Sequence, residues 1–353
     1  MRSDNRSIVF VVPGSLNTRT GGYAFDRRMV RGLRERGWIV DVRELDGGFP
    51  RPTGEALNQA AGVLERIPDG IVIIDGLAFG AMPAEVERVA SRLRVVALIH
   101  LPLSAEIGLQ PDVAMRLKAS EQRALASASL IIVTGKATKA DLERSGVPNR
   151  RIAVVEPGTA RAPLARGSQP GPLQLLCVAP LNPGKGHDLL IDALAAVQHP
   201  EWHLTCAGSI ERHPATVRKV RELLHARHLE SRVALVGDLD EAKLADCYDK
   251  ADLFVLATCG ETYGMAVAEA LARGLPVVST MTGAIPELVG DEAGMLVPVG
   301  DVSAFTAALS QVLSDDALRA RLAEGARRMR ERLPSWEDSV AKMASALESL
   351  SDD

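Results

Sequence analysis

The chain has 353 residues, of which 46% are hydrophobic and 24% charged, with a formal net charge of −4. These values are typical of a soluble globular chain long enough for two domains, each with its own core. The longest apolar runs, residues 7–12 and 70–76, are too short to cross a bilayer, so we expect no membrane span, no signal peptide and a cytoplasmic location. The four cysteines lack C-x-x-C spacing, which indicates buried free thiols.

The first half of the chain alternates short apolar runs with amphipathic stretches. Strands are predicted at residues 7–12, 39–45, 71–75, 95–100, 130–134 and 152–155. Unbroken apolar runs of this kind are typical of parallel strands covered on both faces. Between the first two runs, a predicted helix carries Phe25, Met29 and Leu33 on one face and ends at Gly37. The first half therefore predicts a doubly wound α/β domain.

A stretch rich in Gly, Pro and Ala follows at residues 158–172 and is the predicted linker. Further strands are predicted at residues 173–179, 203–208, 233–237, 253–257, 276–279 and 294–297. We therefore predict two Rossmann-like doubly wound domains, residues 1–163 and 164–336, that face a central cleft at the carboxyl ends of their strands. We expect the last helix, about residues 337–353, to cross back onto the first domain.

Two glutamates flank the predicted start of a helix. Glu261 lies in a loop after a strand, and the backbone amides of residues 264–266 would point out of the helix N-terminus, where they attract phosphate. Eight helical residues at ~1.5 Å each would separate Glu261 from Glu269 by roughly 12 Å. This separation excludes a proton-sharing pair and fits two contacts on one elongated ligand. A capped helix with Glu269 as an ordinary surface charge is the alternative.

Residues 261–301 resemble the E-x7-E donor-binding region of retaining family 4 glycosyltransferases, which have the GT-B fold. The run "TGAIPELV" is similar to the GG-x-PE element of that family, with Thr282 in place of the first Gly. The resemblance implies that the first Glu and the amides after it contact the sugar and its phosphate, and that the second Glu binds the ribose hydroxyls. The donor-binding residues implied here are Glu261, Thr262, Tyr263, Gly264, Met265, Ala266 and Glu269.

A second match is "APLNPGKGHDLLIDAL", residues 179–194. It resembles the G-R-L-x-x-x-K-G pattern of the same family, whose Arg and Lys hold the donor diphosphate. Lys185 occupies the Lys position, whereas Pro180 occupies the Arg position. A charge-assisted contact to phosphate is commonly worth ~1.5–3 kcal/mol. Either another cation substitutes, with Arg19 and Lys136 as candidates, or the activity is weak or absent.

The first domain contains "PGSLNTRTGGYAFDRR", which resembles the N-terminal glycine loop of the family. Gly21 and Gly22 would let the backbone approach the diphosphate, although turns alone explain many Gly-Gly pairs. His100 ends a predicted strand, where a lone His is more often a structural residue. Because the family carries a His after this strand, the resemblance implies a catalytic role for His100, together with Lys185 and Glu261.

Two further motifs have plainer interpretations. Residues 238–240, "DLD", match a D-x-D metal motif, but their place before a helix favours capping. No His, Asp or Glu cluster has metal-ligand spacing, so we predict no metal and no cofactor. The basic run Arg27–Arg36 indicates a solvated helix face, and contact with an anionic inner membrane face or with a phosphorylated acceptor is the other option. No interleaved aromatic residues favour nucleic acid.

The sequence thus predicts a metal-independent retaining glycosyltransferase that moves a sugar from a UDP- or GDP-linked donor to an acceptor hydroxyl. The growing charge of the leaving diphosphate would be stabilised by Lys185 and backbone amides. The acceptor, whether a small molecule, a glycan or a lipid, stays open. A sugar-nucleotide epimerase on the same fold is one alternative. A degenerate, non-catalytic sugar-nucleotide-binding protein is the other, and Pro180 is the residue that favours it.

Overall fold

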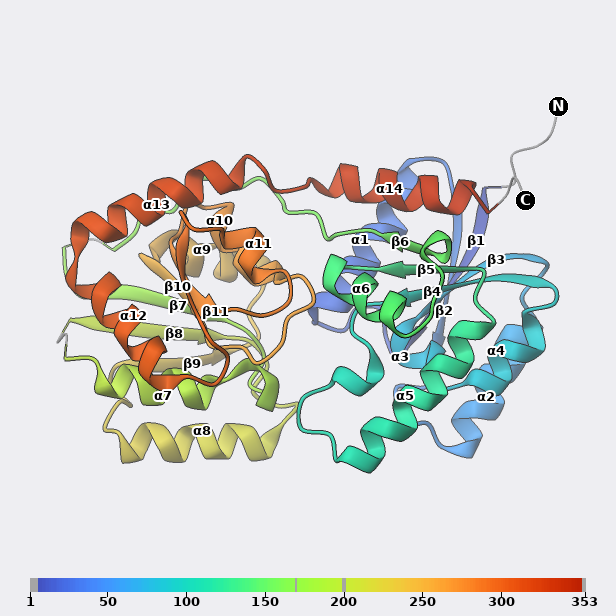
Figure 1. The fold of residues 1–353 in the computed structure, drawn as a ribbon, viewed down its shortest axis with the longest axis horizontal. Helices are drawn as coiled ribbons and strands as arrows, with labels where there is room; N and C mark the ends of the chain where they lie inside the picture. Colours follow the sequence, from blue (N-terminus) through green and yellow to red (C-terminus); the bar gives the residue numbers. More distant parts are fainter. Residues whose placement is uncertain (1–5, 169, 199–200, 351–353) are drawn as a thin grey trace. The chain divides into compact units, whose positions relative to one another are not determined.

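The computed structural model describes residues 6–168, 170–198 and 201–350 (Figure 1). The chain divides into two compact units, Met1–Gly158 with Pro334–Asp353, and Thr159–Leu333. The domain boundaries predicted from the sequence, at residues 163 and 336, lie a few residues after these unit boundaries. Among the described residues, none of the helices combines the length and the apolar character that a membrane span requires.

The first unit is built on a parallel sheet with the strand order β2-β1-β3-β4-β5-β6 (Figure 1). Its strands are β1 (Ser7–Pro13), β2 (Ile39–Leu45), β3 (Gly70–Asp75), β4 (Leu93–Ile99), β5 (Leu130–Val133) and β6 (Ile152–Val154). Its helices are α1 (Gly21–Glu35), α2 (Gly54–Glu65), α3 (Gly76–Phe79), α4 (Pro83–Val89), α5 (Pro111–Ala126), α6 (Lys136–Arg144) and α14 (Trp336–Glu348), with 3-10 turns η1 (Leu103–Ala105) and η2 (Asn149–Arg151). The six predicted strands are all present.

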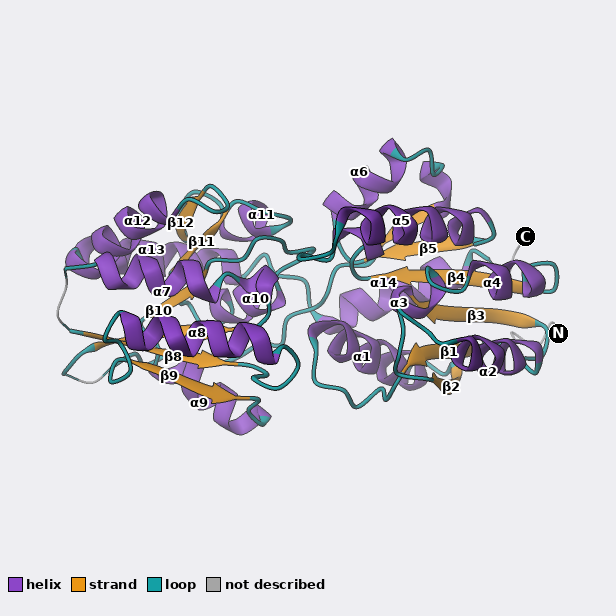
Figure 2. Cartoon of the chain, turned by 90° about the horizontal axis from the view of Figure 1, so that it is seen from below, coloured by secondary structure: helices purple, strands orange, loops and turns teal. Residues whose placement is uncertain are grey.

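Both faces of this sheet are buried, as the unbroken apolar runs predict. On β1, Ile8 and Phe10 pack with α1 and α14, whereas Val9 and Val11 pack on the opposite face with α2 to α6. Successive side chains of a strand point to opposite faces, so each apolar run contributes to two cores. Figure 2 shows helices on both sides of the strands.

The last helix, α14, packs in the core of the first unit beside α1. Its start carries a capping box between Ser335 and Asp338, in which each side chain accepts from the backbone amide of the other. Gly32 of α1 provides the close approach, because a Cβ atom there would lie 2.4 Å from Cγ2 of Val340. The expected crossing of the last helix onto the first domain corresponds to this packing, except that residues 351–353 lie outside the described residues.

The second unit has a parallel sheet with the order β12-β11-β10-β7-β8-β9. Its strands are β7 (Leu173–Val178), β8 (Trp202–Ala207), β9 (Val233–Gly237), β10 (Leu253–Leu256), β11 (Val277–Thr280) and β12 (Gly294–Val297). Its helices are α7 (His187–Ala196), α8 (Pro214–Ala226), α9 (Glu241–Lys250), α10 (Met265–Leu271), α11 (Ile285–Val289), α12 (Val302–Ser314) and α13 (Asp316–Arg330), with the 3-10 turn η3 (Pro183–Lys185). The predicted α/β class with two doubly wound parallel sheets is confirmed.

One helix boundary in this unit was not predicted. The stretch after residue 302 divides at Asp315, whose carboxylate accepts a hydrogen bond of 2.8 Å from the backbone amide of Leu318 and begins α13. The sequence predicts an interruption only at residues 333–336. An Asp before an apolar helical run is a known signal for the start of a helix. The sequence therefore contained the signal at Asp315, but the helical periodicity continues across it and predicts a single helix there.

Candidate functional site

Two loops of the second unit are fastened together at the carboxyl edge of its sheet. The backbone amide of Cys259 and the hydroxyl of Thr258, both after β10, donate to the carbonyl oxygen of Gly184, at 2.8 and 3.1 Å. Gly186 has a φ of +62°, and a Cβ atom there would lie 2.0 Å from the carbonyl oxygen of Ala257. Only glycine tolerates both conditions. The loop that carries Lys185 is therefore held directly against the loop that carries Glu261.

Lys185 and Glu261 are in contact, although 76 positions separate them in the chain. The ammonium group of Lys185 donates to Oε1 of Glu261, and 21% and 14% of the two side chains remain exposed. The backbone of Gly283 lies directly against the backbone of Glu261. A Cβ atom at Gly283 would lie 1.4 Å from the carbonyl oxygen of Glu261, so only glycine allows this approach. Gly283 is the second residue of the "TGAIPELV" run, which explains why glycine stands there. Two predicted site residues thus form one partly buried charged pair.

Glu269 lies on α10 and is anchored by a tyrosine that the sequence analysis missed. The hydroxyl of Tyr248, on α9, donates to Oε2 of Glu269 at 3.0 Å. Burial and the charge of Glu269 raise the pKa of Tyr248 well above its ordinary value, so the hydroxyl stays a donor. The guanidinium of Arg273 lies 4.3 Å from the centre of the Tyr248 ring. Glu269 is therefore an oriented, half-buried carboxylate and not a freely solvated surface charge.

The remaining residues of the predicted donor-binding set follow Glu261. Helix α10 begins at Met265 after Gly264, which has a φ of +95°, so the helix starts where the sequence predicts. Thr262 and Ala266 are half-buried. The side chain of Tyr263 packs in the hydrophobic core, which leaves its backbone as the part able to contact a ligand.

Pro180 follows β7, where the resembling family has a cation. The neighbouring backbone is closely packed, because a Cβ atom at Gly208 would lie 2.2 Å from the carbonyl oxygen of Ala179. Of the two substitutes named from the sequence, Arg19 lies in the exposed loop before α1, and Lys136 opens α6 with its ammonium group 3.9 Å from Glu156. Both belong to the first unit. A replacement for the missing arginine stays a prediction.

In the first unit, His100 follows β4 and lies between two aspartates. Its Nε2 atom is 2.9 Å from Oδ1 of Asp26, on α1, and 3.5 Å from Oδ2 of Asp75, at the end of β3. Gly22 makes room for the ring, because a Cβ atom there would lie 3.2 Å from Cδ2 of His100. Gly21 is the first residue of α1. The structure thus brings the glycine pair and His100 together.

The two aspartates change the protonation of this group. Burial, and then the nearby charge of Asp26, raise the pKa of Asp75 to about 7 against the opposing effects of His100 and of the hydrogen bond from the amide of Leu77. Burial alone would lower the pKa of His100, but the charges of Asp26 and Asp75 and the hydrogen bond to Asp26 raise it above its ordinary value. Near neutral pH His100 is thus biased towards the imidazolium form. The sequence shows that Asp75 ends a predicted strand, but only the pairing of β3 with β4 places it beside His100.

The other sequence motifs have local explanations. Asp240 accepts a hydrogen bond of 2.8 Å from the amide of Lys243 and caps α9, which confirms capping for residues 238–240. The arginines of the Arg27–Arg36 run are engaged within the first unit. Their partners are the carbonyl oxygens of Leu16, Thr18, Val40 and Glu337, the carboxylate of Glu35 and the ring of Trp336. The proposed membrane contact of this run stays a prediction.

Two clusters of potential metal ligands appear only in the folded chain. Within the described residues, Asp26, Asp75 and His100 form one group and Cys177, His187 and Cys206 the other, each with its ligand atoms within 4.8 Å of one another. The members of each group come from three different elements, so no spacing motif could reveal them. The expectation that the protein needs no metal stays a prediction.

Residues 164–329 match the family model described as glycosyl transferases group 1. That range covers nearly the whole second unit. It contains the Lys185 loop, Glu261 and Glu269. The second unit belongs to the glycosyl transferases group 1.

Curated relatives of the chain carry glycosyltransferase names. D-inositol 3-phosphate glycosyltransferase of Xylanimonas cellulosilytica is 31% identical over 250 residues, which are 66% of this chain and 60% of that protein. Lipopolysaccharide core biosynthesis mannosyltransferase LpsB of Rhizobium meliloti is 32% identical over 165 residues, 45% of this chain and 46% of that protein. The chain thus spans about 60% of the length of the first of these relatives and less of the second.

Solved structures share the fold of the chain over almost its full length. Sucrose-phosphate synthase from Thermosynechococcus elongatus superposes with a TM-score of 0.82 at 20% identity, covering 98% of this chain and 99% of that one. HepE of Anabaena, crystallised with UDP-glucose, superposes with a TM-score of 0.73 at 17% identity, covering 98% and 100%. At these identities the likeness shows the fold alone, which is the GT-B fold of two Rossmann-like domains.

Proposed function

We propose that this chain is a retaining, family 4 glycosyltransferase that transfers a sugar from a nucleotide-diphosphate donor to an acceptor hydroxyl without a metal ion. The contact between Lys185 and Glu261 carries the proposal. It joins the two residues that the resemblance assigns to the donor diphosphate and the donor sugar, inside a unit of the glycosyl transferases group 1. The UDP and UDP-glucose named with HepE favour UDP over GDP as the nucleotide.

The chemical demand of this reaction is the departure of a nucleoside diphosphate. In the proposal, Lys185 exchanges its contact with Glu261 for the diphosphate oxygens, and the amides of residues 264–266 add donors. Glu261 is then available as an acceptor for sugar hydroxyls. The pair is partly buried, so the ammonium acts on the leaving group with less screening than at an open surface.

Glu269 is assigned to the ribose hydroxyls of the donor. Its Oε2 atom accepts from Tyr248, which orients the carboxylate. A carboxylate that accepts from two vicinal hydroxyls selects a ribonucleotide over a deoxyribonucleotide, because the deoxy form lacks one donor.

His100 is assigned to orientation of the donor sugar. The raised pKa of His100 favours the protonated ring, which donates hydrogen bonds and does not accept a proton. A donor suits a contact with a hydroxyl or phosphate oxygen better than it suits deprotonation of an acceptor. No side chain is assigned as a covalent nucleophile.

The test is a thermal-shift screen of the full chain against UDP-, GDP-, ADP- and TDP-sugars, followed by transfer assays with the donor that binds. We expect stabilisation by one nucleotide series in the wild type and its loss in Lys185→Met. Lys243→Met, which changes an exposed lysine of the same unit, should bind as the wild type does. The absence of any shift at millimolar donor would refute the proposal.

Two outcomes of the same assays would replace the proposal by its alternatives. Interconversion of the sugar nucleotide without an acceptor would identify an epimerase. Donor binding without transfer or hydrolysis across a broad acceptor panel would identify a degenerate binding protein, in which Pro180 marks the lost phosphate contact.

A further inference from the structure

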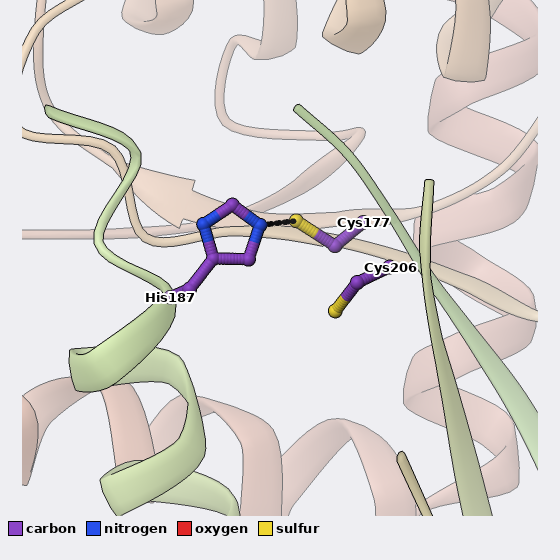
Figure 3. A group of neighbouring side chains, drawn as sticks. All are labelled: Cys177, His187 and Cys206. Atoms are coloured by element: carbon purple, nitrogen blue, oxygen red, sulfur yellow. Dashed lines mark hydrogen bonds between the residues drawn. The ribbon is translucent and has the colours of Figure 1, made fainter. Parts of the chain in front are cut away.

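A buried cluster of two thiols and an imidazole lies at the carboxyl edge of the second sheet (Figure 3). Cys177 and Cys206 are the last-but-one residues of β7 and β8 and are direct partners in the strand register. His187 is the first residue of α7. The exposed fractions of the three residues are 1%, 1% and 2%. Figure 3 shows the ring of His187 directed at the sulfur of Cys177, with the sulfur of Cys206 beside it.

The imidazole of His187 is poorly satisfied where it lies. Its Nε2 atom faces Sγ of Cys177 at 3.8 Å, and its Nδ1 atom has no hydrogen-bond partner within the described residues. An apolar side chain would fill this place without that cost, since burial of an unpaired polar group is unfavourable. Packing accounts for two buried thiols, but it does not account for a buried histidine whose ring nitrogen points at one of them.

We propose that Cys177, His187 and Cys206 bind a thiophilic metal ion, Zn²⁺, through Sγ, Nε2 and Sγ. Thiolate and imidazole are the donors that Zn²⁺ prefers, at about 2.3 and 2.0–2.1 Å. Donor atoms around one such ion lie roughly 3.5–3.8 Å apart at tetrahedral angles. The 3.8 Å between Nε2 and Sγ of Cys177 agrees with that spacing, and all three donor atoms lie within 4.8 Å of one another.

Charge favours Zn²⁺ over Cu⁺ in this position. Two thiolates and one neutral imidazole make a neutral site with Zn²⁺, whereas Cu⁺ would leave one negative charge in a buried environment. The three protein donors leave the fourth position of a tetrahedral Zn²⁺ to a non-protein donor such as water.

The place of this site gives the ion a structural task. Lys185 lies two positions before His187. The backbone of the intervening Gly186 packs against the carbonyl group of Ala257, in the loop after β10. An ion held by β7, β8 and the first residue of α7 would fix both ends of the loop that presents Lys185. The proposal concerns metal binding itself and stands whether or not the chain transfers sugars.

The experiment measures metal bound to the full chain, purified without a histidine tag and with the thiols kept reduced. We expect one Zn²⁺ per chain by elemental analysis, and, after exchange, the visible absorption and thiolate charge-transfer bands of tetrahedral Co²⁺. Cys177→Ala, Cys206→Ala and His187→Gln should weaken Zn²⁺ binding by more than the roughly 10–100-fold that loss of an outer-shell partner costs. Cys247→Ala removes a less buried thiol of the same unit and should bind Zn²⁺ as the wild type does.

Thermal unfolding of the same proteins separates loss of the site from loss of the fold. Zn²⁺ should raise the melting temperature of the wild type and of Cys247→Ala, a chelator should lower it, and the three ligand variants should melt cooperatively without responding to either. Less than a tenth of an equivalent of metal in the wild type, Co²⁺ spectra without thiolate bands, or equal Zn²⁺ affinity in the wild type and the ligand variants would overturn the proposal.

Discussion

At the scale of single residues, the group of Asp26, Asp75 and His100 makes stability depend on pH. The pKa of Asp75 rises from 3.8 to about 7 on folding, so the folded chain binds more protons than the unfolded chain between those values. The pKa of His100 is also raised, so its contribution is present below its ordinary pKa and is lost as pH rises through the folded value. Both effects lower the free energy of unfolding of the first unit as pH rises, for Asp75 between about pH 3.8 and 7 and for His100 as pH passes through its raised pKa.

Asp75→Asn should therefore flatten this pH dependence. The amide oxygen of Asn can still accept from the backbone amide of Leu77, as Oδ1 of Asp75 does at 2.8 Å, but it carries no charge to be buried at high pH. We expect the variant to gain stability relative to the wild type between about pH 5 and pH 8, measured by urea unfolding. Asp41→Asn, at an exposed position, is the control. A wild-type free energy of unfolding that rises across this range would contradict the assignment.

Glu269 supports a second prediction at the residue scale. Glu269→Ala should weaken nucleotide binding roughly 10–100-fold, because a hydrogen bond to a charged group is worth about 1.5–3 kcal/mol. Isothermal titration with the preferred nucleotide measures this change. Tyr248→Phe keeps the carboxylate and removes the hydrogen bonds from the tyrosine hydroxyl to Glu269 and to the carbonyl oxygen of Ala266, so its affinity should stay much closer to that of the wild type. Glu241→Ala tests an exposed glutamate of α9 and should have no effect. Wild-type affinity in Glu269→Ala would remove this residue from the site.

At the scale of elements, two glycines hold the candidate site by close backbone contact. Gly186→Ala and Gly283→Ala would each place a Cβ atom within 2.0 Å of a backbone carbonyl oxygen, on residues with positive φ. The φ cost alone is about 1–2 kcal/mol, and the overlap must in addition separate the two loops. We expect a lower melting temperature and loss of nucleotide binding in both variants.

Gly260→Ala is the matched control for the glycine variants. It lies in the same loop as Glu261, and a Cβ atom there would meet nothing within 4 Å. Its effect on stability should stay within about 0.5 kcal/mol, as for most surface substitutions. Equal behaviour of Gly260→Ala, Gly186→Ala and Gly283→Ala in melting and binding would show that the contact between the loops is not needed.

At the scale of the whole molecule, the chain enters the first unit twice. Helix α14 adds Val340, Met343, Ala344 and Leu347 to the core that also holds α1 and one face of the first sheet. A chain that ends at Leu333 should therefore lose stability in the first unit only, because the second unit keeps all its elements. Burial of the side chains of Val340, Met343 and Leu347 stabilises the first unit by several kcal/mol, at about 1.5–3 kcal/mol each.

Amide hydrogen exchange distinguishes the two units in this experiment. In the chain ending at Leu333, exchange should accelerate in α1 and β1 and stay unchanged in β7 and β10. A chain ending at Leu350 keeps α14 and should exchange as the full chain does. Equal acceleration in both units would mean that they do not unfold independently.

Much of the fold followed from local sequence. The strands were predictable because parallel strands buried on both faces read as unbroken apolar runs, and Gly or polar residues end them. The start of α10 at Met265 followed from Gly264, and the cap of α9 from Asp240. The motifs also selected Lys185, Glu261 and Glu269 as candidates, because they match positions of the donor-binding motifs that the sequence resembles.

Contacts between these segments depended on the tertiary structure. Spacing along the chain carries no distance, so neither the pair of Lys185 with Glu261 nor the anchoring of Glu269 by Tyr248 could be predicted. Strand order decides the rest: β3 beside β4 brings Asp75 to His100, and β7 beside β8 brings Cys177 to Cys206. The sequence by itself determined the elements and the candidate residues, because hydrophobic periodicity and capping are local. Only the fold decided which candidates meet, because pairing across a sheet is set by burial summed over the whole unit.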